Sequence, residues 1–93
     1  MATQGTATVN FGPWPGVTDT TLVITGQSAI ASTALVEAWL APRATVNHSA
    51  DEHLVDGPIL LAGNITPAIG FTVAAQSRGL ALYGLWSINW VYN

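Results

Sequence analysis

Charged side chains are scarce in this sequence. Asp, Glu, Lys and Arg together supply only 8% of the residues, whereas apolar residues supply 49%. A typical globular protein has about 25% charged residues, spread over its surface. The folded chain must therefore have a surface that is largely neutral or largely covered by other molecules.

Length and charge exclude several classes of protein. A chain of 93 residues is one domain, spanning residues 1–93, because folding units mostly have about 50 to 200 residues. Five acidic residues against two basic ones give a net charge of −3, with no basic stripe to bind phosphate. We therefore expect neither nucleic acid nor anionic membrane as a partner.

Cysteine is absent, which removes disulfides, thiol nucleophiles and thiolate zinc sites. Residues 1–8 are polar and uncharged, without the basic and apolar regions of a secretory signal, so export by that route is not expected. No uncharged apolar run approaches the roughly 20 residues that span a bilayer. We expect a soluble protein made in the cytoplasm.

Alternation of polar and apolar residues predicts β-strands along most of the chain. In residues 6–11, for example, Ala7, Val9 and Phe11 share one face. The other strands of this kind are predicted at residues 20–25, 58–62 and 70–76. Gly63 and Asn64 are expected to begin a reversal after the third of these.

Residues 28–40 leave two structures open. Residues 35–40 read as a strand that stops before Pro42, but a helix competes with it. In a strand, Leu35, Glu37 and Trp39 share a face. A carboxylate between two large apolar groups indicates a face that contacts a partner or water.

Residues 80–92 form the longest predicted strand, with Trp86, Ile88, Trp90 and Tyr92 on one face. Its length would be about 40 Å at about 3.3 Å per residue. That is long for a domain whose radius of gyration should be about 12 Å. We expect the run to bend at Gly84, to cross between sheets or to reach another subunit, and we expect residues 77–79 to be a hairpin connection into it.

These elements predict an all-β fold. Ser49 and Glu52 fit a capping box, which predicts one short helical turn near residues 49–54. The rest is expected to form an antiparallel β-sandwich or barrel, jelly-roll-like, with six to eight strands.

One cluster of ionisable residues lies between residues 48 and 56. Its members His48, Asp51 and His53 are weak candidates for metal ligands, since imidazole and carboxylate suit zinc or manganese. The spacing matches neither H-E-x-x-H nor H-x-x-E-H. A capped turn with packed histidines is the favoured interpretation, and a subunit contact or a non-catalytic ion is the alternative.

No enzyme site is predicted. The only histidines are His48 and His53, and no G-x-S-x-G nucleophile elbow is present. We therefore expect no catalytic residues, no metal and no cofactor.

Four tryptophans offer binding surfaces. Trp14 lies between Pro and Gly residues in a loop expected to be rigid, and is the candidate for stacking on a sugar ring. Trp39, Trp86, Trp90 and Tyr92 are expected to fill a core or a subunit interface, and we take the interface as the working hypothesis.

Several stretches across nearly the whole chain resemble a group of short proteins encoded among the structural genes of tailed bacteriophages, most of them uncharacterised. The matching stretches are residues 7–12, 15–16, 23–27, 36–40, 48–55, 62–65, 70–72 and 82–93. Similar proteins often have a longer insertion before the last strand, where this chain has only residues 76–79. An activity located in that insertion would be missing here.

The resemblance implies a virion protein without enzymatic activity. We expect a homo-oligomer, by analogy a trimer, that decorates and cements the capsid and contacts other virion proteins such as the major capsid protein. The alternative is a receptor- or glycan-binding module at a tail or fibre, using Trp14. The low charge agrees with the first function, because subunit contacts would cover the apolar surface.

Overall fold

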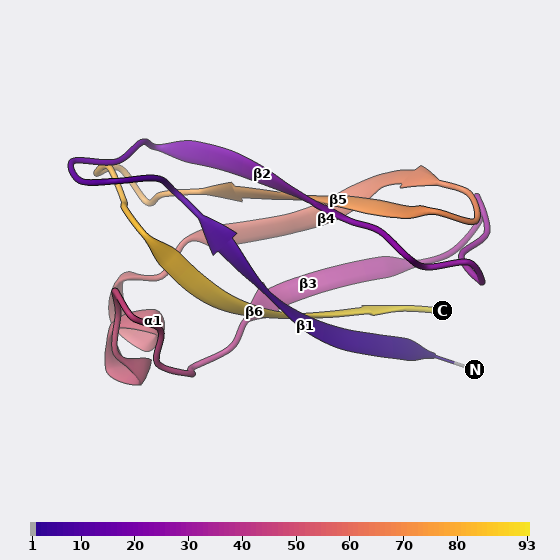
Figure 1. Cartoon of the computed structure of the whole chain (residues 1–93), viewed down its shortest axis with the longest axis horizontal. Helices are drawn as coiled ribbons and strands as arrows, with labels where there is room; N and C mark the ends of the chain where they lie inside the picture. Colours follow the sequence, from indigo (N-terminus) through magenta and orange to yellow (C-terminus); the bar gives the residue numbers. More distant parts are fainter. Residues whose placement is uncertain (1) are drawn as a thin grey trace.

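A computed structural model describes residues 2–93 and confirms the all-β prediction. The elements in chain order are β1 (Thr3–Asn10), β2 (Asp19–Ile24), β3 (Val36–Leu40), α1 (Ala50–Asp56), β4 (Ile59–Thr66), β5 (Gly70–Gln76) and β6 (Leu85–Tyr92). The strands form two antiparallel sheets, β1-β6-β3 and β2-β5-β4, which lie as two layers in Figure 1. The fold is thus a six-stranded sandwich and not a closed barrel.

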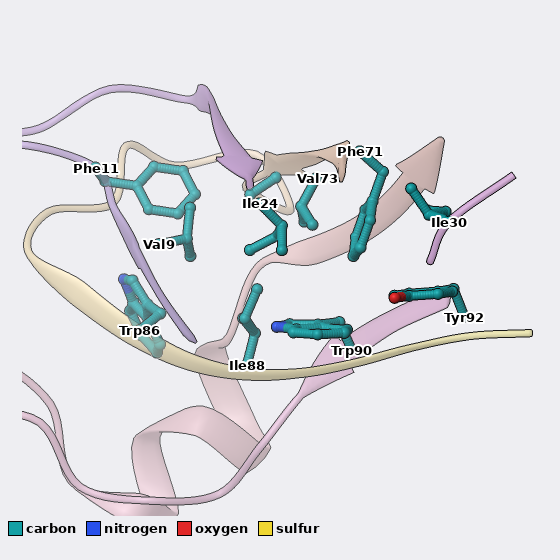
Figure 2. Close-up of a cluster of buried hydrophobic side chains, with 11 residues drawn as sticks. Val9, Phe11, Ile24, Ile30, Phe71, Val73, Trp86, Ile88, Trp90 and Tyr92 are labelled. Carbon is teal, nitrogen blue, oxygen red and sulfur yellow. The ribbon is translucent and has the colours of Figure 1, made fainter. Parts of the chain in front are cut away.

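The core lies between the two sheets, as the alternation predicts. Ile88 and Trp90 point from β6 toward Phe71 and Val73 of β5 in the opposite layer, and Trp86 lies below Val9 and Phe11 (Figure 2). The Phe71 and Trp90 rings pack edge to face, with centroids 5.6 Å apart. Central strands β5 and β6 therefore supply the facing halves of the core.

The long C-terminal run bends at Gly84, as expected. Gly84 has φ 75°, a conformation that only glycine adopts at low cost, and a Cβ there would collide with the Asn47 side chain. Regular β6 begins at the next residue. Before the bend, Leu82 pairs with Val17 in an isolated antiparallel bridge.

The predicted hairpin at residues 77–79 is wrong. β5 pairs with β2 and β4, whereas β6 pairs with β1 and β3. Both long edges of β5 are already occupied, so residues 77–84 cross from one sheet to the other. Local alternation identified both strands but carried no information on which strands pair.

Residues 36–40 form a strand, so the helical alternative for the end of residues 28–40 is not realised.

The predicted reversal at Gly63 and Asn64 is wrong, because β4 continues to Thr66. The pairing of β4 with β5 instead shifts register between Gly63 and Thr66, and Asn64 has φ 50°. Asn tolerates this left-handed conformation, so a bulge forms within the strand.

The predicted helical turn is α1, and its capping box is confirmed. The Ser49 side chain accepts a hydrogen bond from the Glu52 backbone N–H, and the Glu52 carboxylate accepts one from the Ser49 N–H.

Among residues 2–93, no helix has the length and apolar character needed to cross a membrane.

Candidate functional site

The histidines of the ionisable cluster are buried and bonded. His53 lies in α1, and only 1% of its surface is exposed. Its Nδ1 lies 2.7 Å from the Ser49 carbonyl oxygen, and its Nε2 accepts a hydrogen bond from the Ser87 backbone N–H at 2.9 Å. In these bonds Nδ1 donates and Nε2 accepts, so both ring nitrogens are engaged with the backbone.

His48 precedes the capping residue of α1. Its Nδ1 is 2.9 Å from Glu52 Oε2, and its Nε2 donates to the Tyr83 carbonyl oxygen. Both partners only accept hydrogen bonds, so the ring makes both bonds only when both nitrogens carry a proton. The ring also stacks on Trp86, with centroids 3.8 Å apart and an interplanar angle of 20°.

Hydrogen bonds explain the altered acidity of Glu52. The bond from the His48 ring, followed by the bond from the Ser49 backbone N–H, lowers the pKa of the Glu52 carboxyl below its ordinary value of 4.5. Both bonds favour the charged form of the carboxyl group. An ionised Glu52 is therefore part of the folded arrangement around α1.

Two further polar side chains bind the same backbone segment. Thr45 Oγ1 donates to the Leu85 carbonyl oxygen at 2.7 Å, and Asn47 Oδ1 accepts from the Leu85 N–H at 2.9 Å. We call Thr45, Asn47, His48 and His53 the polar clamp, because together they hold the backbone of residues 83–87.

The polar clamp agrees with the favoured interpretation of the cluster. The capped turn with bonded histidines is confirmed. His48, Asp51 and His53 do not converge, and residues 2–93 contain no group of three or more side chains arranged to hold a metal ion. The roles of Thr45 and Asn47 were missed, because their partner lies about 40 residues away along the sequence and no local pattern indicates it.

The loop that carries Trp14 is anchored on both sides. Before it, the Phe11 N–H donates to the Gly84 carbonyl oxygen and the Gly84 N–H donates to that of Gly12. After it, Val17 and Leu82 exchange two hydrogen bonds of 2.9 and 2.8 Å. The loop thus has fixed ends, while 75% of the Trp14 surface remains exposed.

Trp14 forms one wall of a pocket beside α1. Its ring is nearly perpendicular to that of Tyr83, at an interplanar angle of 83° and a centroid distance of 5.3 Å. The pocket has a volume of about 410 Å³. Its other side chains include Trp86 and the ionisable residues His48, Glu52, Asp56 and Arg78. We call this the aromatic pocket.

The sequence identified Trp14 but not the other members of the aromatic pocket. Tyr83 lies in the crossing segment before β6, and Arg78 lies near the start of that segment. Both reach the pocket only because this segment leaves one sheet and returns beside the Trp14 loop. No signal in the local sequence indicates that path.

The four proposed interface residues divide into two groups. Trp39 is 44% exposed on the outer face of β3, with Leu35 and Glu37 exposed nearby, as that strand predicts. The other three, Trp86, Trp90 and Tyr92, lie in the chain's own core. The prediction that they form a subunit interface is therefore wrong.

The physical reason for the correction is the position of β6 at the centre of its sheet. Alternate residues of β6 face the opposite sheet, and the large aromatic rings fill the space between the layers. Within the described chain, the Trp86 indole N–H has no hydrogen-bond partner. Packing, including the His48 stack, therefore holds this ring.

The outer face of the β2-β5-β4 sheet carries a second group of exposed apolar residues, among polar ones. Strand register places Val23 beside Thr72 and Gly63, and Leu61 beside Ala74 and Thr21. Ile59 lies at the end of the same face, paired through Gln76 with Asp19. We call Val23, Ile59, Leu61 and Ala74 the apolar face; Asp19 is the one charged residue in these three rows.

No family model, curated protein or solved structure matches this chain at a significant level. The candidate sites are therefore defined by their own geometry, as the aromatic pocket beside α1 and the apolar face on the opposite layer.

Proposed function

We propose that this chain is a non-enzymatic structural protein of a bacteriophage particle, a homo-oligomer that decorates and cements the head shell. The observation that carries the proposal is the apolar face, where Leu61 is 65% exposed and Val23 and Ile59 are also exposed. The sequence resemblance to proteins encoded among phage structural genes supports the particle assignment.

Physical chemistry favours association through the apolar face. Burying a large aliphatic side chain contributes about 1.5–3 kcal/mol when it passes from full exposure to full burial. Charged groups oppose such burial because they lose their hydration, and here Asp19 alone, at the corner of the face, is charged. A second copy can therefore cover this face at little electrostatic cost.

Trp39 supplies a second contact on the other layer of the sandwich. It lies on β3 in the β1-β6-β3 sheet, whereas the apolar face belongs to the β2-β5-β4 sheet. A subunit with contact surfaces on opposite layers can bind a copy of itself on one side and the major capsid protein on the other. This arrangement suits a protein that links neighbouring parts of a shell.

The experiment that tests this function is cryo-electron microscopy of the phage particles whose genome encodes the chain. The proposal expects density for the six-stranded sandwich on the head shell, with the apolar face between copies. Density at the tail instead would replace the cement role with a tail role. Absence of the chain from purified particles would contradict the proposal altogether.

A further inference from the structure

We propose that the aromatic pocket binds a neutral sugar ring, with Trp14 as the stacking surface. The inference is independent of the proposed assembly, because the aromatic pocket lies beside α1 and shares no residue with the apolar face. It can hold for a single subunit or for an oligomer.

The first argument is that Trp14 is exposed although its loop is anchored. Four backbone hydrogen bonds fix residues 11, 12 and 17 against residues 82 and 84. Gly16 has φ 84°, and a Cβ at this position would collide with the Leu82 carbonyl oxygen, so the close approach of the two segments requires glycine. Ordering of the loop is part of folding, and a ligand need not supply it.

The second argument is the shape of the aromatic walls. Trp14 and Tyr83 meet at 83°, which forms a corner with one broad apolar face. A pyranose ring has a flat side of C–H groups that packs on such a face. It also has a rim of hydroxyls, which must keep hydrogen bonds when they leave water.

The third argument is the polar lining. Glu52 and Asp56 offer acceptors and Arg78 offers donors, and each sugar hydroxyl both donates and accepts. Aromatic walls with a few polar groups are typical of small-molecule sites, which mostly have volumes of about 300–1,000 Å³. The aromatic pocket, at about 410 Å³, lies within that range.

The lining carries charged groups of both signs. The Glu52 carboxylate is already bonded to the His48 ring, and the aromatic pocket contains both Asp56 and the Arg78 guanidinium. Carboxylate acceptors and guanidinium donors together suit the hydroxyls of a neutral sugar, each of which donates and accepts. A cationic probe tests whether the carboxylates bind a cation instead.

The chain contains a natural control. Trp39 borders a smaller hollow of about 260 Å³ on the outer face of β1-β6-β3, together with Gln4, Thr6 and Asn89. The second ring that lines this hollow, Trp90, belongs to the core and is only 7% exposed, and the Asn89 side chain already accepts a hydrogen bond from Arg43. Trp39 is thus an exposed indole outside the proposed site.

The first experiment follows the indole N–H signals of ¹⁵N-labelled protein by NMR during titration with methyl glucoside, methyl galactoside and N-acetylglucosamine. We expect at least one of these pyranosides to shift the Trp14 signal with saturation and to leave the Trp39 signal unchanged. Trp14→Ala should weaken binding by about tenfold or more, as for other central aromatic contacts. Trp14→Tyr should retain part of it, and Trp39→Ala should leave it unchanged.

Two probes test the chemistry of the ligand. Sorbitol has the hydroxyls but no ring, and tetramethylammonium tests a cationic ligand; neither should shift the Trp14 signal to saturation. No saturable shift with any pyranoside, equal binding by Trp14→Ala, or stronger binding of tetramethylammonium would each overturn the proposal. Melting curves of the variants show whether each is folded, and the exposed Trp14 is expected to tolerate both substitutions.

A glycan array then distinguishes the source of the sugar. Binding of wild type, but not of Trp14→Ala, to immobilised oligosaccharides assigns the aromatic pocket to surface glycans. NMR binding of monosaccharides without an array signal assigns it to free sugar. Both results support a sugar site. Absence of binding in both assays overturns the proposal, whether or not the chain forms oligomers.

Discussion

The two halves of β6 are held in place by different forces. At its start, residues 85–87 are bound by the polar clamp, whose side chains reach the backbone through hydrogen bonds. Further along, Ile88, Trp90 and Tyr92 pack on the opposite sheet through apolar contacts. One strand is thus anchored on α1 at one end and on the hydrophobic core at the other.

This comparison shows why residue type alone misleads about function here. The histidines resemble metal ligands, yet His53 joins α1 to β6, and His48, the residue before the cap of α1, binds Tyr83. The aromatic residues of β6 resemble an interface, yet three of them fill the core. The exposed apolar surface is instead formed in part by less conspicuous side chains, such as Leu61 and Val23.

The largest expected effect is in the apolar half. Phe71→Ala removes a buried ring that packs on Trp90 and Tyr92, and should lower the free energy of unfolding by about 3–5 kcal/mol. The control Val46→Ala changes a side chain that is almost fully exposed and should have an effect of about 0.5 kcal/mol or less. Urea denaturation measures both, and similar losses would contradict the assigned core.

The next effect is in the polar half. His53→Leu keeps most of the buried volume but leaves the Ser87 N–H without its acceptor, which should cost about 1–3 kcal/mol of unfolding free energy. Leu54→Ala, at an exposed position in the same helix, serves as control. A loss for His53→Leu no larger than that of the control would show that the polar clamp does not stabilise β6.

A smaller effect is expected at the start of α1. Ser49→Ala removes the side chain that accepts from the Glu52 N–H and should cost about 1 kcal/mol in denaturation experiments. Ser49→Asp keeps an acceptor at the capping position and should recover most of the loss. Failure of this rescue would mean that Ser49 acts through something other than capping.

The smallest effect concerns pH. Because hydrogen bonds lower the pKa of folded Glu52 below 4.5, its stabilising contribution is present above that pH. It is lost as the pH falls through the lowered value of the folded state. Denaturation curves from neutral pH through the acid range should therefore show a weaker decline for Glu52→Gln than for wild type. The control Asp51→Asn removes a neighbouring carboxylate of α1. Equal curves for Glu52→Gln and wild type would show that ionisation of Glu52 does not contribute to the pH dependence of stability.

The sequence predicted the local features of the fold well. Alternation identified the inward residues of the strands, and the Ser49–Glu52 pattern located the cap of α1. The length of the run at residues 80–92 indicated a bend at Gly84 as one of three possibilities, and Gly84 has φ 75°. These signals depend on residues close together in the chain.

Contacts between distant residues could not be predicted in the same way. The pairing of β6 with β1 and β3, the bonds from Thr45 and Asn47 to Leu85, and the approach of Tyr83 to Trp14 all join segments far apart in sequence. The exposed fraction of each tryptophan follows from these pairings. The Pro and Gly residues around Trp14 set it apart from the others, but Trp39 could not be separated from Trp86 and Trp90 by composition or spacing.

The central claim is that copies of the chain cover the apolar face. Sedimentation equilibrium at micromolar concentration tests it directly, on wild type and on the double variant Val23→Ser/Leu61→Ser. We predict an oligomer for wild type, a trimer by analogy with phage proteins of this size, and a folded monomer for the double variant. Wild-type protein that sediments as a monomer throughout that range would contradict the claim.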